Sequence, residues 1–227
     1  MTLVVGATGR LGVAISRALV ARGDRVALTA RDPNKLEAMS AELKSAPYVV
    51  ADLTKADAVE TIAHGVRTKI GAVDDVILAC GPFPRTPFET LSRDDLLHTL
   101  TVHAVAPLLL VSALAKDLAK ANGSVIALGD SGTSRPYTNH VAYLTAKGAL
   151  KTGLRALAEE LAPDVRVNMV QLGIVADPEA DADPLRTHRL AARSALGRFG
   201  TPEEVVHVVL ALLDSTWATG EVWGIGR

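Results

Sequence analysis

The chain has one cysteine, few aromatic residues and almost no net charge. A single cysteine, Cys80, excludes an internal disulfide and is typical of a reducing compartment. With 24 basic and 25 acidic residues, the formal net charge is −1, so no basic field is available to bind nucleic acid. The six histidines show no metal-ligand spacing. We therefore expect neither a nucleic-acid partner nor a metal site.

Signals for export or membrane insertion are also missing from the pattern. Residues 1–6 are typical of a strand that enters a turn, and they lack the charged start and cleavage site of a signal peptide. We find no apolar run that reaches the length of a membrane span. The expectation is a soluble cytoplasmic protein without a membrane partner.

Aliphatic residues are abundant, and apolar strands alternate with helical patterns along the whole chain. Strands are expected at residues 3–5, 25–30, 48–51, 76–79, 124–128, 165–170 and 220–225, and helices at 11–21, 32–43, 54–70, 92–120 and 201–213, with a further helix that contains Tyr143 and ends near residue 161. This alternation predicts a parallel α/β sheet with right-handed crossovers. No repeat or linker is present, which predicts one domain over residues 1–227. The acidic connection at 173–184 is a candidate lid, or a solvated loop.

A glycine-rich turn follows the first strand. Gly6, Gly9 and Gly12 have the spacing Gly-x-x-Gly-x-x-Gly between that strand and the first helix. Glycines let the backbone approach a pyrophosphate, and a helix N-terminus offers free N–H groups and a positive dipole. The context predicts a dinucleotide site, although a plain strand-to-helix turn has the same pattern.

The end of the second strand bears on the choice of cofactor. An acid at this place would hold the ribose 2′-hydroxyl of NAD, whereas Arg31 suits the 2′-phosphate of NADP. Asp32 precedes Pro33, which is typical of a helix N-cap. We therefore predict NADP(H), with Arg10 as a second positive charge; a solvated Arg31 is the alternative. Asp52, after the third strand, is either a partner for the adenine amino group or a turn residue.

Tyr143 and Lys147 lie four residues apart, so they share one face of a helix. An ammonium close to a phenol favours the phenolate and lowers a pKa that is ordinarily about 10. Such a phenol can donate a proton while hydride reaches the neighbouring carbon. The spacing alone is common in helices at the edge of a core, so its meaning depends on the glycine-rich turn.

Three further residues are candidates near this pair. The proline-rich loop at 80–88 leaves a strand end, and its Phe83 offers a flat face to an aromatic substrate or packs on the protein itself. Asp130 follows the fifth strand. His103 lies among apolar helix residues, where a histidine is more often part of the core than a catalyst.

From end to end, the chain resembles the short-chain dehydrogenase/reductase family. The resemblance rests on the glycine turn, the Tyr143 and Lys147 pair, and the segments 165–168 and 197–205. It implies a single-domain, Rossmann-type, doubly wound parallel sheet of about seven strands with helices on both faces, a small-molecule substrate, and a homotetramer or homodimer. It assigns these residues to the cofactor: Gly6, Thr8, Gly9, Arg10, Leu11, Gly12, Arg31, Asp52, Leu53, Cys80, Gly81, Lys147 and Gly173.

Departures from the family pattern look like the pteridine reductase and dihydromonapterin reductase branch. Arg10 replaces the middle glycine of the turn, and Asp130 stands thirteen residues before the tyrosine, where the family has a catalytic serine. Phe83 falls where that branch places a phenylalanine that sandwiches the pterin against the nicotinamide. Other departures weaken the likeness: Gly81 replaces a pterin-binding serine, and His103 replaces the asparagine that holds a water in the family's proton relay. Residues 78–81 also lack the family's Asn-Asn-Ala-Gly segment, and Leu172 replaces its proline.

We therefore expect an NADPH-dependent oxidoreductase acting on a pterin-like or other small unsaturated or carbonyl substrate. Tyr143 would donate the proton, Lys147 would hold the nicotinamide ribose and lower the tyrosine pKa, and Asp130 would orient or reprotonate Tyr143. Phe83, Asp130, Ser131 and Tyr143 are the expected substrate contacts. A carboxylate cannot donate to a ketone oxygen, which favours a nitrogen heterocycle.

Three alternatives stay open from the sequence. Ser131 takes the serine's role if the loop shifts by one residue, or Asp130 only caps a turn. In either case, the enzyme would be a general carbonyl reductase. Outside catalysis, the chain is a catalytically weak NADP-binding sensor.

Overall fold

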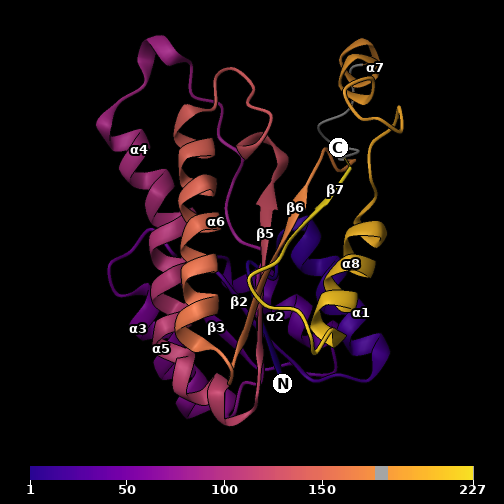
Figure 1. The fold of residues 1–227 in the computed structure, drawn as a ribbon. Helices are drawn as coiled ribbons and strands as arrows, with labels where there is room; N and C mark the ends of the chain where they lie inside the picture. The colour runs from indigo at the N-terminus through magenta and orange to yellow at the C-terminus, as the bar shows by residue number, and fades with distance from the viewer. Residues whose placement is uncertain (177–183, 227) are drawn as a thin grey trace.

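A computed structural model describes residues 1–176 and 184–226 and contains one seven-stranded sheet, in the order β3-β2-β1-β4-β5-β6-β7 (Figure 1). The strands are β1 (Thr2–Val5), β2 (Val26–Ala30), β3 (Tyr48–Val50), β4 (Asp75–Leu78), β5 (Ser124–Asp130), β6 (Arg166–Leu172) and β7 (Val222–Ile225). Every neighbouring pair is parallel. The predicted doubly wound α/β sheet is confirmed.

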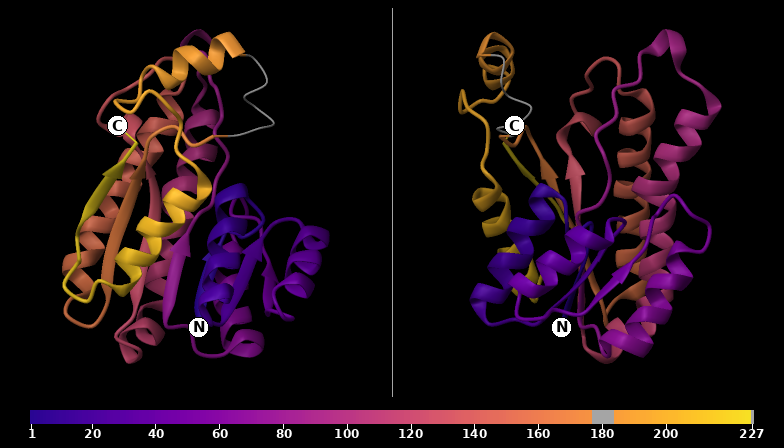
Figure 2. Two further views of the ribbon diagram at one scale, coloured as in Figure 1. Left: turned by 90° about the vertical axis from the view of Figure 1, so that its right-hand side faces the viewer. Right: turned by 180° about the vertical axis from the view of Figure 1, so that it is seen from behind.

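Helices cover both faces of the sheet, as predicted (Figure 2). They are α1 (Arg10–Arg22), α2 (Pro33–Glu42), α3 (Ala58–Gly65), α4 (Arg93–Leu100), α5 (Ala106–Lys120), α6 (Val141–Leu161), α7 (Pro184–Ala191) and α8 (Pro202–Asp214). Successive strand residues point to opposite faces. Leu3 and Val5 of β1 accordingly pack with α3, α5 and α6, whereas Val4 packs with α1, α2 and α8. The sheet therefore has a buried apolar layer on each side.

Two local predictions have different outcomes. Asp32 is the N-cap of α2, as expected, because its carboxylate accepts a hydrogen bond from the backbone N–H of Lys35 at 3.1 Å. The predicted helix start at residue 54 is wrong: α3 begins only at Ala58. Asp52 closes a turn there, since its carboxylate accepts the N–H of Thr54 at 3.0 Å.

The long helix predicted at 92–120 is present but contains a π-helical turn, η3 (Thr101–Val105), between α4 and α5. By length and composition this helix could cross a membrane, which corrects our prediction that no run qualifies. In the fold it packs on α3 and α6, and its apolar residues Leu110, Leu114 and Leu118 are fully buried. Packing in the core therefore accounts for its apolar composition.

Two predictions concern surfaces rather than the core. The candidate lid at 173–184 falls mostly on residues 177–183, which lie outside the described residues. The predicted homodimer or homotetramer remains a prediction. The exposed apolar residues Leu97, Val105 and Leu109 lie on the long helical segment formed by α4, η3 and α5.

Candidate active site

The carboxyl ends of the parallel strands meet at one edge of the sheet, and the strand order reverses between β1 and β4. Ligands of open α/β sheets bind at such a reversal. Two cavities of about 360 Å³ each lie along this edge of the sheet. We call them the glycine-turn cleft and the aromatic pocket, after the residues that line them.

The glycine-turn cleft brings together eight of the residues predicted to bind the cofactor: Gly6, Thr8, Gly9, Arg31, Asp52, Leu53, Cys80 and Gly81. Its turn has room only for glycine. A Cβ at Gly6, whose φ is +82°, would lie 2.7 Å from Cys80 Cα, and one at Gly12 would lie 2.2 Å from the Gly6 carbonyl oxygen. A glycine cradle at the N-terminus of α1 fits a pyrophosphate.

Other predicted cofactor residues lie elsewhere. Arg10 donates to the Val175 carbonyl at 3.2 Å and does not line the cleft, so its role as a second positive charge stays a prediction. Lys35, in the first turn of α2, lines the cleft beside Arg31 instead. Its position four residues after Arg31 was a signal that the sequence reasoning missed. Leu11 and Gly12 support the turn from within α1, and Gly173 lines the aromatic pocket.

Tyr143 and Asp130 meet at the centre of the site. The Tyr143 side chain, in the first turn of α6, is 7% exposed, and its hydroxyl donates to Asp130 Oδ2 at 3.0 Å. Asp130 ends β5, two residues beyond the predicted strand end. The other carboxylate oxygen, Oδ1, accepts from the Tyr137 hydroxyl at 3.0 Å and from the Gly132 N–H at 2.7 Å. The sequence reasoning missed Tyr137, six residues before Tyr143.

The loop after β5 is not shifted by one residue, so Ser131 does not occupy the position of the family's catalytic serine. It lines the aromatic pocket, whereas Asp130 faces Tyr143. Asp130 also caps the short turn that follows β5, because its Oδ1 accepts from the Gly132 N–H. The turn-capping alternative is therefore correct for this oxygen. The other oxygen is bound to Tyr143.

The ionisation of Tyr143 differs from the prediction. Burial of the hydroxyl, followed by the negative charge of Asp130, raises the pKa of Tyr143. The Lys147 ammonium is 5.8 Å from the ring centroid and donates to the Leu128 carbonyl at 2.9 Å. Burial lowers the pKa of Lys147. The pKa depression that we expected Lys147 to cause is therefore wrong for this arrangement of the site.

His103 and Gly81 are two departures from the family pattern that share one structural cause. The imidazole stands edge-on to the Tyr143 ring, 5.1 Å between centroids, and neither ring nitrogen has a hydrogen-bond partner in the described part of the chain. Burial and the charge of Lys147 lower the pKa of His103 to about 3. A Cβ at Gly81 would lie 2.1 Å from His103 Cε1. The imidazole thus occupies space that a serine at position 81 would need.

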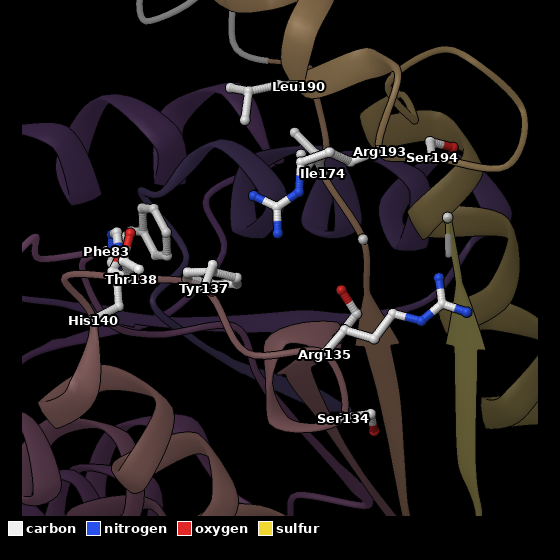
Figure 3. A pocket seen from close by; sticks show the side chains of 13 residues that line it. Phe83, Ser134, Arg135, Tyr137, Thr138, His140, Ile174, Leu190, Arg193 and Ser194 are labelled. Carbon is white, nitrogen blue, oxygen red and sulfur yellow. The ribbon is translucent and has the colours of Figure 1, made fainter.

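The aromatic pocket lies beside Phe83 (Figure 3). It is lined by Phe83, Ser131, Ser134, Arg135, Tyr137, Thr138, His140, Gly173, Ile174, Leu190, Arg193, Ser194 and Gly226. Phe83 stacks on His140 at 4.5 Å and meets the edge of Tyr143 at 4.9 Å between centroids. It is still 59% exposed. Both interpretations of Phe83 therefore apply, since it packs on the protein and keeps a surface open.

Comparisons with known proteins agree with this architecture. The family model described as enoyl-(acyl carrier protein) reductase matches residues 6–225. The chain is 31% identical to L-xylulose reductase of Bos taurus over 226 residues, covering 96% of this chain and 91% of the relative. It is 26% identical to the 3-oxoacyl-[acyl-carrier-protein] reductase of Rattus norvegicus over 221 residues, covering 96% and 93%.

Solved structures have the same fold. L-sorbose reductase from Gluconobacter frateurii, complexed with NADPH and L-sorbose, superposes with a TM-score of 0.91 at 21% identity, over 99% of this chain and 94% of that one. A protein from Thermus thermophilus gives a TM-score of 0.88 at 31% identity, over 99% and 95%. The chain therefore belongs to the short-chain dehydrogenase/reductase family of oxidoreductases.

Proposed function

We propose that the protein is an NADPH-dependent reductase in which Tyr143 donates the proton. The observation that carries the proposal is the position of Tyr143 between the two cavities: it contacts the aromatic pocket directly and the glycine-turn cleft through His103. Its ring meets Phe83 of the aromatic pocket, and it meets His103, which packs on Gly81 of the glycine-turn cleft. A proton donor is needed where a cofactor site and a substrate site adjoin.

The residues of the chain have separate tasks in this proposal. A bound nicotinamide would supply the hydride. Tyr143 retains its proton at neutral pH, because its pKa is raised, and releases it only when an acceptor forms on the substrate. Asp130 holds the Tyr143 hydroxyl in place through Oδ2. Lys147, directed at the Leu128 carbonyl, would hold the nicotinamide ribose.

The preference for NADPH over NADH rests on Arg31 and Lys35, which line the cleft beyond the glycine turn. The carboxylate of Asp32 is engaged as the helix cap and so does not replace them as a ribose ligand. We expect Arg31→Gln to raise the Kd of NADPH about tenfold, since a charge-assisted contact to phosphate is lost, and to leave the Kd of NADH unchanged. Arg155→Gln, on the exposed face of α6, is the matched control. An equal loss of affinity for both cofactors would refute this assignment.

For the substrate, we propose a planar pterin-like ring. Asp130 offers no hydrogen to a ketone oxygen but can accept from a ring N–H, and Phe83 with His140 provides an aromatic wall. The test is NADPH oxidation with dihydrobiopterin and dihydrofolate. Tyr143→Phe should abolish turnover and Asp130→Ala should impair it strongly. Tight NADPH binding by the parent protein, without turnover of either compound, would exclude the pterin proposal.

A carbonyl substrate is the second candidate, because the Ser131 hydroxyl lines the aromatic pocket and the similar proteins named above include carbonyl-reducing enzymes. Turnover of a ketone that Ser131→Ala impairs, together with inactivity on pterins, would select this candidate. The sensor alternative predicts NADPH binding without oxidation on any pterin, quinone or ketone.

A further inference from the structure

The aromatic pocket is positively charged in a protein whose net charge is −1. Arg135 and Arg193 line it, and none of its described lining residues is acidic. Within residues 1–176 and 184–226, neither arginine forms an ion pair. Figure 3 shows the Arg193 guanidinium between Ile174 and Tyr137, inside the space that the pocket residues enclose. The pocket therefore presents positive charge for which the described residues supply no negative partner.

The position of Arg193 is set by an aromatic ring. Its guanidinium carbon lies 5.8 Å from the centroid of Tyr137. Such a cation–π contact fixes the guanidinium plane while its N–H groups remain free to donate. Ile174, Leu190 and Phe83 give the pocket apolar walls, and apolar walls strengthen a charge interaction because they reduce its screening by water.

We propose that the substrate carries an oxyanion, a carboxylate or a phosphate, which Arg193 and Arg135 bind in the aromatic pocket. The inference rests on the proposed reductase function and names the substrate class of the same site. Guanidinium groups match carboxylate and phosphate oxygens with paired hydrogen bonds. Ser134 and Ser194, which also line the pocket, offer further hydroxyl donors. A neutral sugar would leave both cations unused.

The oxyanion site is linked to the proton donor through one residue. Tyr137 contacts Arg193 with its ring and donates to Asp130 with its hydroxyl. Asp130 in turn accepts from Tyr143. A substrate held by its oxyanion end at Arg193 is therefore anchored next to the residues that position the donor, and its reducible bond can lie against Tyr143.

Matched substrate pairs that differ only in charge test this inference. The pairs are levulinate with methyl levulinate, and dihydrofolate with its dimethyl ester. We expect the parent protein to have a kcat/KM at least about tenfold higher for the charged member, the size expected for a charge-assisted hydrogen bond. Arg193→Gln and Arg135→Gln should each reduce that ratio several-fold, whereas the control Arg155→Gln should leave it unchanged. Inhibition of turnover by acetate is compared with inhibition by inorganic phosphate, and the stronger inhibitor indicates whether the site binds a carboxylate or a phosphate.

A binding measurement separates this inference from the proposed function. Titration calorimetry gives the Kd of folate and of folate dimethyl ester in the presence of NADP⁺. Tighter binding of folate that Arg193→Gln removes supports the oxyanion site even if no compound is reduced, an outcome in which only the proposed function fails. Turnover that is equal for the charged and neutral members overturns the oxyanion site and leaves the reductase function intact. Equal binding of the two members without turnover overturns both. Absence of both binding and turnover overturns both.

Discussion

We expect Gly81→Ala to destabilise the protein through a collision with His103. Gly81 has a φ of +112°, in the left-handed region, and a Cβ there would lie 2.1 Å from His103 Cε1 and 2.4 Å from Nδ1. The imidazole is 1% exposed and packs against Tyr143, so it has little room to move away. The substitution therefore combines an unfavourable backbone conformation with overpacking of a buried ring.

The two costs can be estimated separately. A non-glycine residue in the left-handed region costs about 1–2 kcal/mol, and overpacking of a well-filled interior costs about 1–3 kcal/mol. We therefore expect Gly81→Ala to lower the free energy of unfolding by about 2–5 kcal/mol. Gly23 provides the matched control, because it has a left-handed backbone with a φ of +99° and a Cβ there meets no atom within 4 Å. Gly23→Ala should lose only the backbone part, about 1–2 kcal/mol.

Urea unfolding of both variants measures these free energies, and a double-mutant cycle isolates the contact. Removing the ring as well, in Gly81→Ala with His103→Ala, should recover at least about 1 kcal/mol relative to the sum of the single effects. The reasoning fails if Gly81→Ala costs no more than Gly23→Ala. It also fails if the two single effects add to within about 0.5 kcal/mol, because the residues would then be energetically independent.

Three further predictions follow from the centre of the site. Tyr143→Phe should lower kcat by about 10²–10⁴-fold without weakening NADPH binding, as measured by steady-state kinetics and fluorescence titration. Tyr137→Phe should lower kcat more than it changes the Kd of NADPH, because Asp130 loses one of its three donors. His103 has a pKa of about 3 in the fold, below its unfolded value of about 6.5, so the unfolded state binds the extra proton. The contribution of His103 to the free energy of unfolding should be fully present above about pH 6.5. It should fall by up to about 1.4 kcal/mol per pH unit as the pH drops toward 4. Urea unfolding of His103→Asn should show a shallower pH dependence.

Features encoded by neighbouring residues were predictable from the sequence. The alternation of apolar strands and helices predicted the parallel sheet, because each element carries its own periodicity. Asp32 followed by Pro33 predicted the N-cap of α2, since this pattern depends on two adjacent residues. The predicted start of the following helix at residue 54 failed, because a turn and a helix start use the same residue types. Asp52 closes a turn there, which is one of the two roles predicted for it.

Features that depend on distant parts of the chain were not predictable. Arg10 follows the glycine turn in sequence, yet its guanidinium is bound by the carbonyl of Val175, 165 residues away. The sequence pattern suggested that Lys147 lowers the pKa of Tyr143. It could not show that burial and Asp130 raise this pKa instead. Local spacing indicates which groups can meet, whereas desolvation depends on everything packed around them.

Tyr137 connects the two proposals physically. Its ring holds Arg193, and its hydroxyl holds the same carboxylate that positions Tyr143. Loss of Arg193 would remove only the interaction with the substrate's oxyanion, whereas loss of the Tyr137 hydroxyl would loosen Asp130 and so act on the proton donor. Arg193 variants should therefore change KM, and Tyr137→Phe should change kcat. If both kinds of variant changed the same kinetic constant, Tyr137 would not divide substrate binding from proton transfer in the way that these contacts imply.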